Sequence, residues 1–329
     1  MRTSRLSPRE SLRPTPRAMV EANPQSAPCP SCAQGEEADL QTAIDNLSRK
    51  YTQLAEMMAR YMSQAHLERG ARAANAESMA KLLIRIVGGF ETAPGEYPDC
   101  CLIGRKFSNG TQSWFCTGVL VHPRVVLTAG HCQDPTFAIN VVALNAVNQA
   151  ALSDAEIIGV RRVVVNPGYP QRMGNDINVL ILRRNATVDP TPIASTADIA
   201  AADTTTLVGF GNNDILSTKG FGIQRQVEVD LTHVRRAAGD DLDEDEETIG
   251  FESDLEFVAG GSGYDSCNGD SGGPAYILVG GERKVAGLTS RATEGATNPC
   301  GDGGIYTRVD TQREFINGVM RAANIDGSV

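Results

Sequence analysis

The chain has 329 residues, 41% of them hydrophobic, which is enough to bury a core in one large domain plus a smaller segment, or in two domains. Its net charge of −10 argues against nucleic acid as the main partner, and apolar runs such as residues 179–182 are too short to span a membrane. Abundant glycine (33 residues) and few aromatic residues (5%) favour a loop-rich β protein.

The charge changes sign along the chain. Residues 1–85 hold 12 Lys and Arg against 9 Asp and Glu, a net of +3, whereas residues 86–329 hold 18 against 31, a net of −13. This difference predicts a boundary near Arg85. Residues 1–35 are polar and proline-rich and lack the apolar centre of a secretory signal, so we predict a disordered tail, with an unrecognised targeting segment as the alternative.

Residues 36–85 carry a helical pattern without proline. Apolar side chains recur at spacings of four and three residues: Leu40, Ile44, Leu47, Tyr51, Leu54, Met58, Tyr61 and Ala65. We therefore predict a helical pro-segment over residues 36–85. Self-association through residues 40–65 as a coiled coil, a helical hairpin, and docking on the same chain all remain open.

A Cys-x-x-Cys pair, Cys29 and Cys32, precedes this helix. A zinc site needs about four ligands and no second such pair exists, while a redox pair calls for a preceding strand. Two thiols in a flexible segment are the favoured reading, and a cross-link between chains or half of a shared site are the alternatives.

From Ile86 onward, short β-rich runs alternate with turn residues, which predicts antiparallel barrels or sandwiches. The runs cover residues 101–103, 118–121, 124–128, 163–165, 179–182, 206–208, 275–279 and 285–288. Gln312 to Asn324 is predicted to form a closing helix whose apolar face holds Phe315, Ile316, Val319 and Met320.

Three motifs carry the chemistry. His131 follows an apolar run in Thr-Ala-Gly-His-Cys, Asp176 begins an apolar run, and Ser271 lies in Cys-Asn-Gly-Asp-Ser-Gly-Gly-Pro. A nucleophilic serine needs a base, and that base needs a buried acid to fix its tautomer. Glycines beside the serine let backbone N–H groups point at a developing oxyanion. The three motifs in this order indicate acyl transfer.

With these motifs, residues 86–329 resemble the trypsin-like (chymotrypsin-fold) serine peptidases over nearly their full 244 residues. The resemblance implies an all-β fold of two antiparallel six-stranded β-barrels with a C-terminal helix. It implies His131 as general base, Asp176 as its orienting acid, Ser271 as nucleophile, and an oxyanion hole formed by the N–H groups of Gly269 and Ser271. No cofactor or metal is implied, and the substrate is a protein or peptide.

Ile86-Val-Gly-Gly after Arg85 resembles the family's activation site. Cleavage after Arg85 would free the Ile86 ammonium, which in the family pairs with the acid before the nucleophile, here Asp270. Such a buried ion pair needs good geometry to offset desolvation. The intact chain is therefore predicted to be a zymogen; the alternative is that Ile86 simply opens the first strand.

The resemblance also predicts cleavage after Arg or Lys. Asp265 lies six residues before Ser271, where the trypsin branch holds the acid at the base of the primary pocket. Gly304 matches the glycine that keeps that pocket open. The substrate-binding edge departs from the family's Ser-Trp-Gly: it holds Ser290, Arg291 and Ala292, and a longer stretch afterwards leaves Gly295 as another candidate for the glycine role.

Six cysteines belong to this part of the chain. The resemblance pairs Cys116 with Cys132 and Cys267 with Cys300, each bridge stabilising by a few kcal/mol. Cys100 and Cys101 have no family counterpart, and we expect one buried and one exposed thiol. Bridges favour a secreted or periplasmic location and the missing signal favours an intracellular one, so the compartment stays open.

Two features leave alternatives. Residues 239–247 hold seven acids and are predicted to form a solvated loop, with a Ca²⁺ site or a docking strip for a basic partner as alternatives. The second concerns function: a non-catalytic protease-like binding module competes with the peptidase hypothesis, and an oligomerisation or adaptor role for residues 1–85 is compatible with it.

Overall fold

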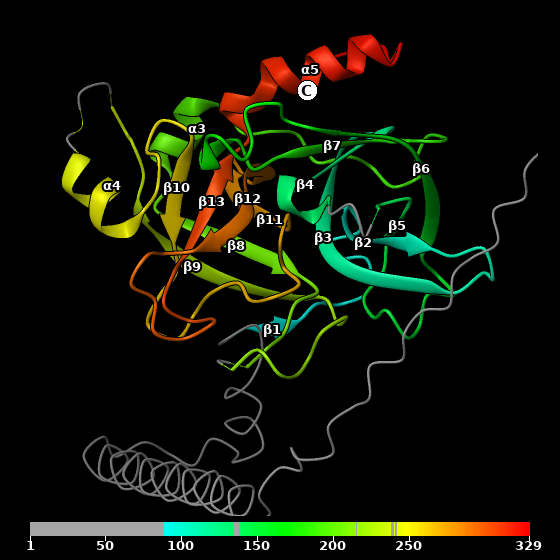
Figure 1. The fold of residues 1–329 in the computed structure, drawn as a ribbon, viewed down its shortest axis with the longest axis horizontal. Helices are drawn as coiled ribbons and strands as arrows, with labels where there is room; N and C mark the ends of the chain where they lie inside the picture. The colour runs from blue at the N-terminus through cyan, green and yellow to red at the C-terminus, as the bar shows by residue number, and fades with distance from the viewer. Residues whose placement is uncertain (1–88, 134–137, 215, 238–239, 241) are drawn as a thin grey trace, which may run out of the picture. The chain divides into compact units, whose positions relative to one another are not determined.

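A computed structural model gives the fold (Figure 1). It describes residues 89–133, 138–214, 216–237, 240 and 242–329. The tail over residues 1–35, the helical segment over 36–85, self-association through 40–65 and the Cys29/Cys32 pair lie outside the described residues and stay predictions. Within the described residues, no helix is long and apolar enough to cross a membrane.

The first half of the described chain closes into an antiparallel β-barrel in the order β2-β3-β4-β7-β6-β5. Its strands are β2 (Cys100–Lys106), β3 (Gln112–His122), β4 (Val125–Thr128), β5 (Val141–Leu144), β6 (Glu156–Val165) and β7 (Asn178–Leu182). Strands β4 and β7 are short runs in which every residue is buried, as their apolar, β-branched sequences predict. The interior is filled by side chains such as Ile103, Leu120, Val142 and Leu180.

The second half forms another six-stranded antiparallel barrel, β8-β9-β10-β13-β12-β11, which closes because β8 pairs with both β9 and β11. The strands are β8 (Thr204–Gly209), β9 (Arg225–His233), β10 (Glu256–Ala259), β11 (Pro274–Val279), β12 (Glu282–Ala292) and β13 (Gly304–Arg308). The short strand β1 (Phe90–Glu91) pairs with β9. The prediction of two six-stranded barrels is thus confirmed, although β5, β9, β10 and β13 were not among the predicted runs.

The predicted closing helix is also confirmed, as α5 (Arg313–Ala322) after the short 3₁₀ turn η3 (Asp310–Gln312). Figure 1 shows α5, in red, lying along one side of the barrels. Ile316, Val319 and Met320 are buried in a core cluster that includes strand residues of both barrels, and Phe315 packs against it. The apolar face therefore anchors the helix to both barrels.

Two helices were not predicted. Helix α3 (Thr196–Ala201) begins with a capping box between Ser195 and Asp198. The acidic stretch expected to be a loop contains helix α4 (Asp243–Ile249), which corrects that prediction. Acids near a helix N-terminus are favourable with its dipole, and Gly250 ends the helix in a left-handed conformation at φ 78°.

Candidate functional site

Strand pairing brings His131 and Asp176 together. Strand β4 runs antiparallel to β7 with Thr128 opposite Asn178. His131 lies three residues beyond β4 in the 3₁₀ turn η1 (Gly130–Cys132), and Asp176 lies two residues before β7. Both side chains therefore emerge at the same end of the strand pair, although 45 residues separate them in the chain.

Asp176 holds the histidine by two contacts. Its Oδ2 lies 2.8 Å from His131 Nδ1, and its Oδ1 accepts from the His131 backbone N–H at 2.9 Å. Asp176 is 1% exposed, and burial alone would raise the pKa of its carboxyl group. Hydrogen bonds from His131 and Ser290, together with the His131 charge, outweigh burial and lower that pKa. The acid is therefore ionised at neutral pH.

Ser290 on β12 provides the third contact to this acid. Its Oγ donates to Asp176 Oδ2 at 2.6 Å. Sequence reasoning placed Ser290 on the substrate-binding edge, and it does line the pocket described below. Its side chain thus joins the second barrel to the His–Asp pair of the first.

The segment that carries Ser271 is shaped by glycine. Gly269 has φ 99° and Gly272 has φ 75°, a region that favours glycine. A Cβ on Gly272 would come within 2.1 Å of Thr128 Oγ1, and one on Gly269 within 2.5 Å of the Phe221 ring. Gly272 is therefore required for the close approach of this turn to β4, and Gly269 for its packing against Phe221.

Thr117 on β3 fixes the turn from the first barrel. Its backbone N–H donates to the Ser271 carbonyl at 3.0 Å, and its Oγ1 donates to the Gly269 carbonyl at 2.9 Å. Its own carbonyl accepts from Thr128 Oγ1 at 2.7 Å. Sequence reasoning missed Thr117, because nothing in its local sequence marks a residue whose partners lie about 150 positions away.

A pocket opens beside Ser271 with Asp265 in its lining. Asp265 is 3% exposed, and its Oδ1 accepts from the Ser266 N–H at 2.7 Å and from the Tyr306 hydroxyl at 3.2 Å. Burial raises the pKa of Asp265 to about 6, although these hydrogen bonds act in the opposite direction. The pocket therefore presents a buried carboxylate whose charge is only partly compensated.

The other predicted pocket residues lie around the same opening. Ala292 and Gly304 face each other as a pair across β12 and β13, and both line the pocket. A Cβ on Gly304 would approach Asp265 Oδ1 to 2.9 Å, so glycine leaves the acid accessible. Gly295 is not among the lining residues, which places Ala292, not Gly295, at the mouth.

Arg291 lines this pocket, and a buried acid that was not predicted, Glu256, lies behind it. Its Nη2 donates to Glu256 Oε2 at 2.9 Å and to the Gly250 carbonyl at 2.7 Å. Glu256 on β10 is fully buried, whereas the Arg291 side chain is 23% exposed. Arg291 thus forms one wall with Glu256 behind it, and nothing in the local sequence marks this pairing, because the two residues lie on different strands.

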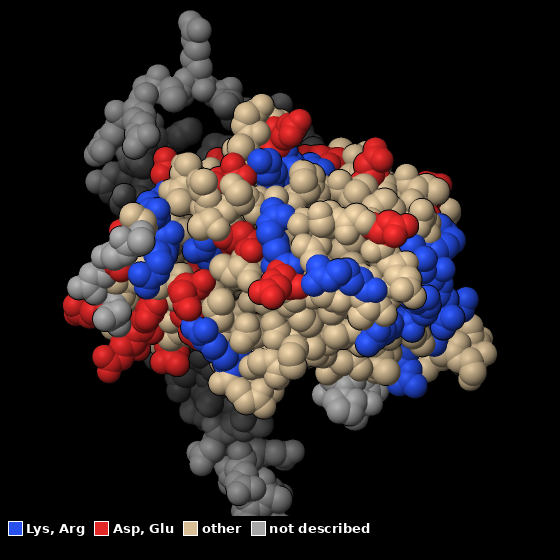
Figure 2. Space-filling view, turned by 90° about the horizontal axis from the view of Figure 1, so that it is seen from above, with Lys and Arg blue, Asp and Glu red and all other residues tan. Residues whose placement is uncertain are grey.

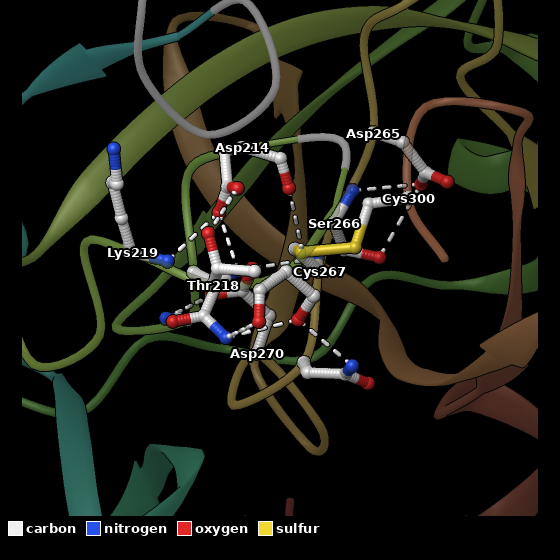
Figure 3. Close-up of a disulfide and its surroundings, with 12 residues drawn as sticks. Asp214, Thr218, Lys219, Asp265, Ser266, Cys267, Asp270 and Cys300 are labelled. Atoms are coloured by element: carbon white, nitrogen blue, oxygen red, sulfur yellow. Dashed lines mark hydrogen bonds between the residues drawn. A yellow bond between two sulfur atoms is a disulfide. The ribbon is translucent and has the colours of Figure 1, made fainter. Parts of the chain in front are cut away.

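Both disulfides implied by the resemblance are present, Cys116–Cys132 and Cys267–Cys300. The first ties β3 to the turn that holds His131. Figure 3 shows the second bridge beside Asp265 and Ser266, where it connects the Ser271 segment to the loop before β13. The expectation for Cys100 and Cys101 was wrong, because both free thiols are buried. Cys100 belongs to one core cluster and Cys101 to another.

Asp270 lies buried next to Ser271. Its Oδ1 accepts from the Gly211 N–H at 2.7 Å and its Oδ2 from the Cys267 N–H at 2.8 Å. Burial raises the pKa of Asp270 to about 6, and the Arg225 charge lowers it only in part. Its predicted partner Ile86, like Arg85, lies outside the described residues.

Comparisons with known proteins agree with this geometry. Mouse tryptase is 29% identical over 250 residues, covering 70% of this chain and 87% of tryptase. Bovine chymotrypsin-like elastase family member 1 is 28% identical over 247 residues, covering 72% and 90%. A solved structure titled "Structure of GrC" superposes with a TM-score of 0.58 at 26% identity, covering 71% of this chain and 99% of the other. The family model described as Trypsin matches residues 86–316, so the chain belongs to the trypsin family of serine proteases.

Proposed function

We propose that this serine protease cleaves protein or peptide chains after Arg or Lys, with His131, Asp176 and Ser271 as its catalytic residues. The Asp176 contact at Nδ1 leaves Nε2 as the His131 nitrogen that takes the Ser271 proton. Ser271 Oγ then attacks the scissile carbonyl, and the N–H groups of Gly269 and Ser271 stabilise the oxyanion. The oxyanion then collapses, the scissile C–N bond breaks, and the His131 imidazolium gives its proton to the departing amine, which leaves an acyl-enzyme. Water hydrolyses this ester, with His131 again acting as base.

The observation that carries the Arg/Lys preference is the buried Asp265 carboxylate in the pocket that Ser271 also lines. A guanidinium or ammonium entering the pocket would gain a charge-assisted hydrogen bond and supply the missing countercharge. A pocket for small apolar side chains has no need of a buried acid, which costs desolvation energy. This contrast favours a basic residue over the small residue that an elastase-like pocket would take.

Replacing Asp265 with Ser tests this specificity. We expect kcat/KM for a peptide with Arg before the cleaved bond to fall roughly 10²–10³-fold, because the substrate cation would be buried without its partner. Hydrolysis of a small ester that does not fill the pocket should stay within about threefold, since this variant leaves the acyl-transfer residues in place.

The matched control is Asp203→Ser, which removes an acid whose side chain is 93% exposed on the second barrel. This variant should change neither kcat/KM for the Arg peptide nor the rate of ester hydrolysis. An Asp265→Ser enzyme that keeps its preference for Arg over Phe would show that the pocket assignment is wrong. Loss of ester hydrolysis as well would point to misfolding of the pocket and would be checked by thermal unfolding.

The raised pKa of Asp265 predicts a pH-dependent specificity. Because that pKa is about 6, roughly nine-tenths of Asp265 is ionised at pH 7 but only about a tenth at pH 5. The ratio of kcat/KM for an Arg peptide to that for a matched Met peptide should therefore fall about tenfold between these pH values. Any pH effect on the acyl-transfer step is common to both peptides and cancels in the ratio. A flat ratio in stopped assays at pH 5, 6 and 7 would contradict an ionising acid in the pocket.

The same proposal includes activation by cleavage between Arg85 and Ile86. It is supported by the buried Asp270, which receives two backbone N–H groups and, among the described residues, has no carboxylate–cation contact within 4.0 Å. A new ammonium would supply that charge next to the Ser271 turn. Cleavage after Arg is also the specificity proposed for the enzyme itself, so one active molecule could activate another.

A further inference from the structure

Charge is unevenly distributed on the face that carries α5. Figure 2 shows a cluster of Asp and Glu at the left end of this face and a cluster of Lys and Arg at the right end, with residues of both signs between them. The acidic end includes the exposed Glu244 and Glu247 of α4, and the basic end belongs to the first barrel. Since the whole chain has a net charge of −10, this local excess of arginine runs against its composition.

An irregularity in β6 turns two of these arginines outward. The pairing of β6 with β7 shifts register between Val160 and Arg162, so Arg161 is an extra residue. In a regular strand, neighbouring side chains point to opposite faces. Here both Arg161 and Arg162 are exposed, and the Arg161 guanidinium donates to the Ala323 carbonyl at 3.0 Å, just beyond α5. The bulge thus directs consecutive cations toward the helix.

An open groove runs between β6 and α5. Arg162 on the β6 side and Arg321 on the helix side lie toward the end where Arg161 contacts Ala323. Pro167 and Phe315 lie toward the other end, where Asn166 contacts Gln312. Phe315 is only partly buried, so an apolar surface continues the groove beyond the cations. Glu314 is the one acid in the lining described for this groove.

The arginines of this region lack carboxylate partners. Among the described residues, no Asp or Glu lies within 4.0 Å of Arg161, Arg162, Arg183 or Arg321 in an ion pair, whereas the neighbouring Arg184 contacts Glu156. Arg183 follows β7 and packs over Gly159 of β6, beside the bulge. Several guanidinium groups are therefore available to an external anion.

We propose that this groove binds an acidic peptide segment that also carries an apolar side chain. Guanidinium groups bind carboxylates through paired hydrogen bonds, and the Phe315 surface farther along the groove fits an apolar residue of the same segment. A purely charged polymer would use the arginines but not the apolar floor. A peptide therefore matches the lining better than a sulfated polysaccharide does.

The position of the groove suggests what the segment belongs to. Asn166 lines the groove and begins the loop that ends at Asp176. Its Nδ2 donates to Gln312 Oε1 at 2.8 Å, and Gln312 in turn donates to Asn175 Oδ1 at 3.3 Å. The groove and the His131–Asp176 pair thus flank one loop. An acidic stretch in a protein substrate, away from the cleaved bond, is the occupant that this placement favours.

The inference is tested by binding, independently of the proposed specificity. The probe is a fluorescein-labelled twelve-residue peptide of Glu and Asp with one central Phe, which contains no Arg or Lys. We expect fluorescence anisotropy to show binding to the full chain at low salt that weakens as salt rises. Arg162→Gln combined with Arg321→Gln should weaken it about tenfold, at roughly 0.7 kcal/mol per exposed charge contact.

The matched control is Arg236→Gln, which removes an exposed cation on the second barrel and should leave binding unchanged. A peptide with Ser in place of Phe should bind several-fold more weakly. Equal binding by the wild type and the double variant would overturn the proposal, as would binding of heparin without binding of the peptide. The double variant should keep its thermal midpoint and its rate on a small ester, so that lost binding cannot reflect lost folding.

Discussion

An Asp176→Asn variant is expected to lose about four orders of magnitude in kcat while its fold is preserved. Asp176 accepts three hydrogen bonds, from the His131 backbone, His131 Nδ1 and Ser290 Oγ. An amide in this place can donate to Nδ1 and so stabilise the tautomer that carries its proton on Nε2. That tautomer cannot accept the Ser271 proton, so the base is lost although every side chain remains in position.

Steady-state kinetics on an Arg peptide would measure this effect. KM should change little, because Asp265 and the pocket wall are untouched. Ser290→Ala is the control, since it removes one of the three donors but leaves the carboxylate; it should cost roughly tenfold, as expected for one hydrogen bond to a charged group. An Asp176→Asn enzyme with kcat within tenfold of the wild type would remove Asp176 from the catalytic assignment.

Preventing cleavage at residue 85 should have the second large effect. We expect Arg85→Gln to leave an intact chain whose activity is about 10²–10³-fold below that of the cleaved enzyme, the loss typical of a missing oxyanion donor. The reason is that Asp270 precedes Ser271 and is bonded to Gly211 and Cys267, so its position sets the turn that contains the oxyanion donors. Active-site titration combined with N-terminal sequencing would measure it.

A rescue experiment separates activation from folding. Replacing residues 82–85 with the recognition sequence of an unrelated protease should give a chain that becomes active only after that protease is added, with Ile86 as the new N-terminus. Wild-type protein that is fully active with the bond after Arg85 intact would falsify the zymogen hypothesis.

Cleavage should also change how stability depends on pH. In the intact chain the folded pKa of Asp270, about 6, exceeds its unfolded value near 3.9. Its contribution to stability is therefore fully present below about pH 4 and is lost as pH rises through 6. Pairing with the Ile86 ammonium should lower the folded pKa and remove this loss. Asp265 is present in both the intact and the cleaved form, so its effect is the same in each. The change in thermal midpoint between pH 5 and pH 7 should therefore differ between the two forms by the contribution of Asp270.

The sequence was informative where chemistry depends on short contiguous motifs. The turns around His131 and Ser271 and the acid before β7 are local, so their residue types and spacing marked these residues as candidates, and the structure places His131 in contact with Asp176. The buried Glu256 behind Arg291 could not be predicted in this way, because the pairing depends on the order of β10, β13 and β12 in the barrel. Helix α4 was missed because its run of acids was interpreted as a solvated loop, although acids near a helix N-terminus are favourable and Gly250 can end a helix.

Thr117 has a consequence for how the molecule unfolds. One residue of the first barrel bonds to two carbonyls of the Ser271 turn, and its Oγ1 also accepts from the Phe210 N–H, all in buried surroundings. Sliding one barrel past the other would break these contacts at the same time and leave buried polar groups without a hydrogen-bond partner. The barrels should therefore lose structure in a single transition. A chain nicked within the mostly exposed residues 183–187, which follow β7, should remain one particle until heat melts both halves at once.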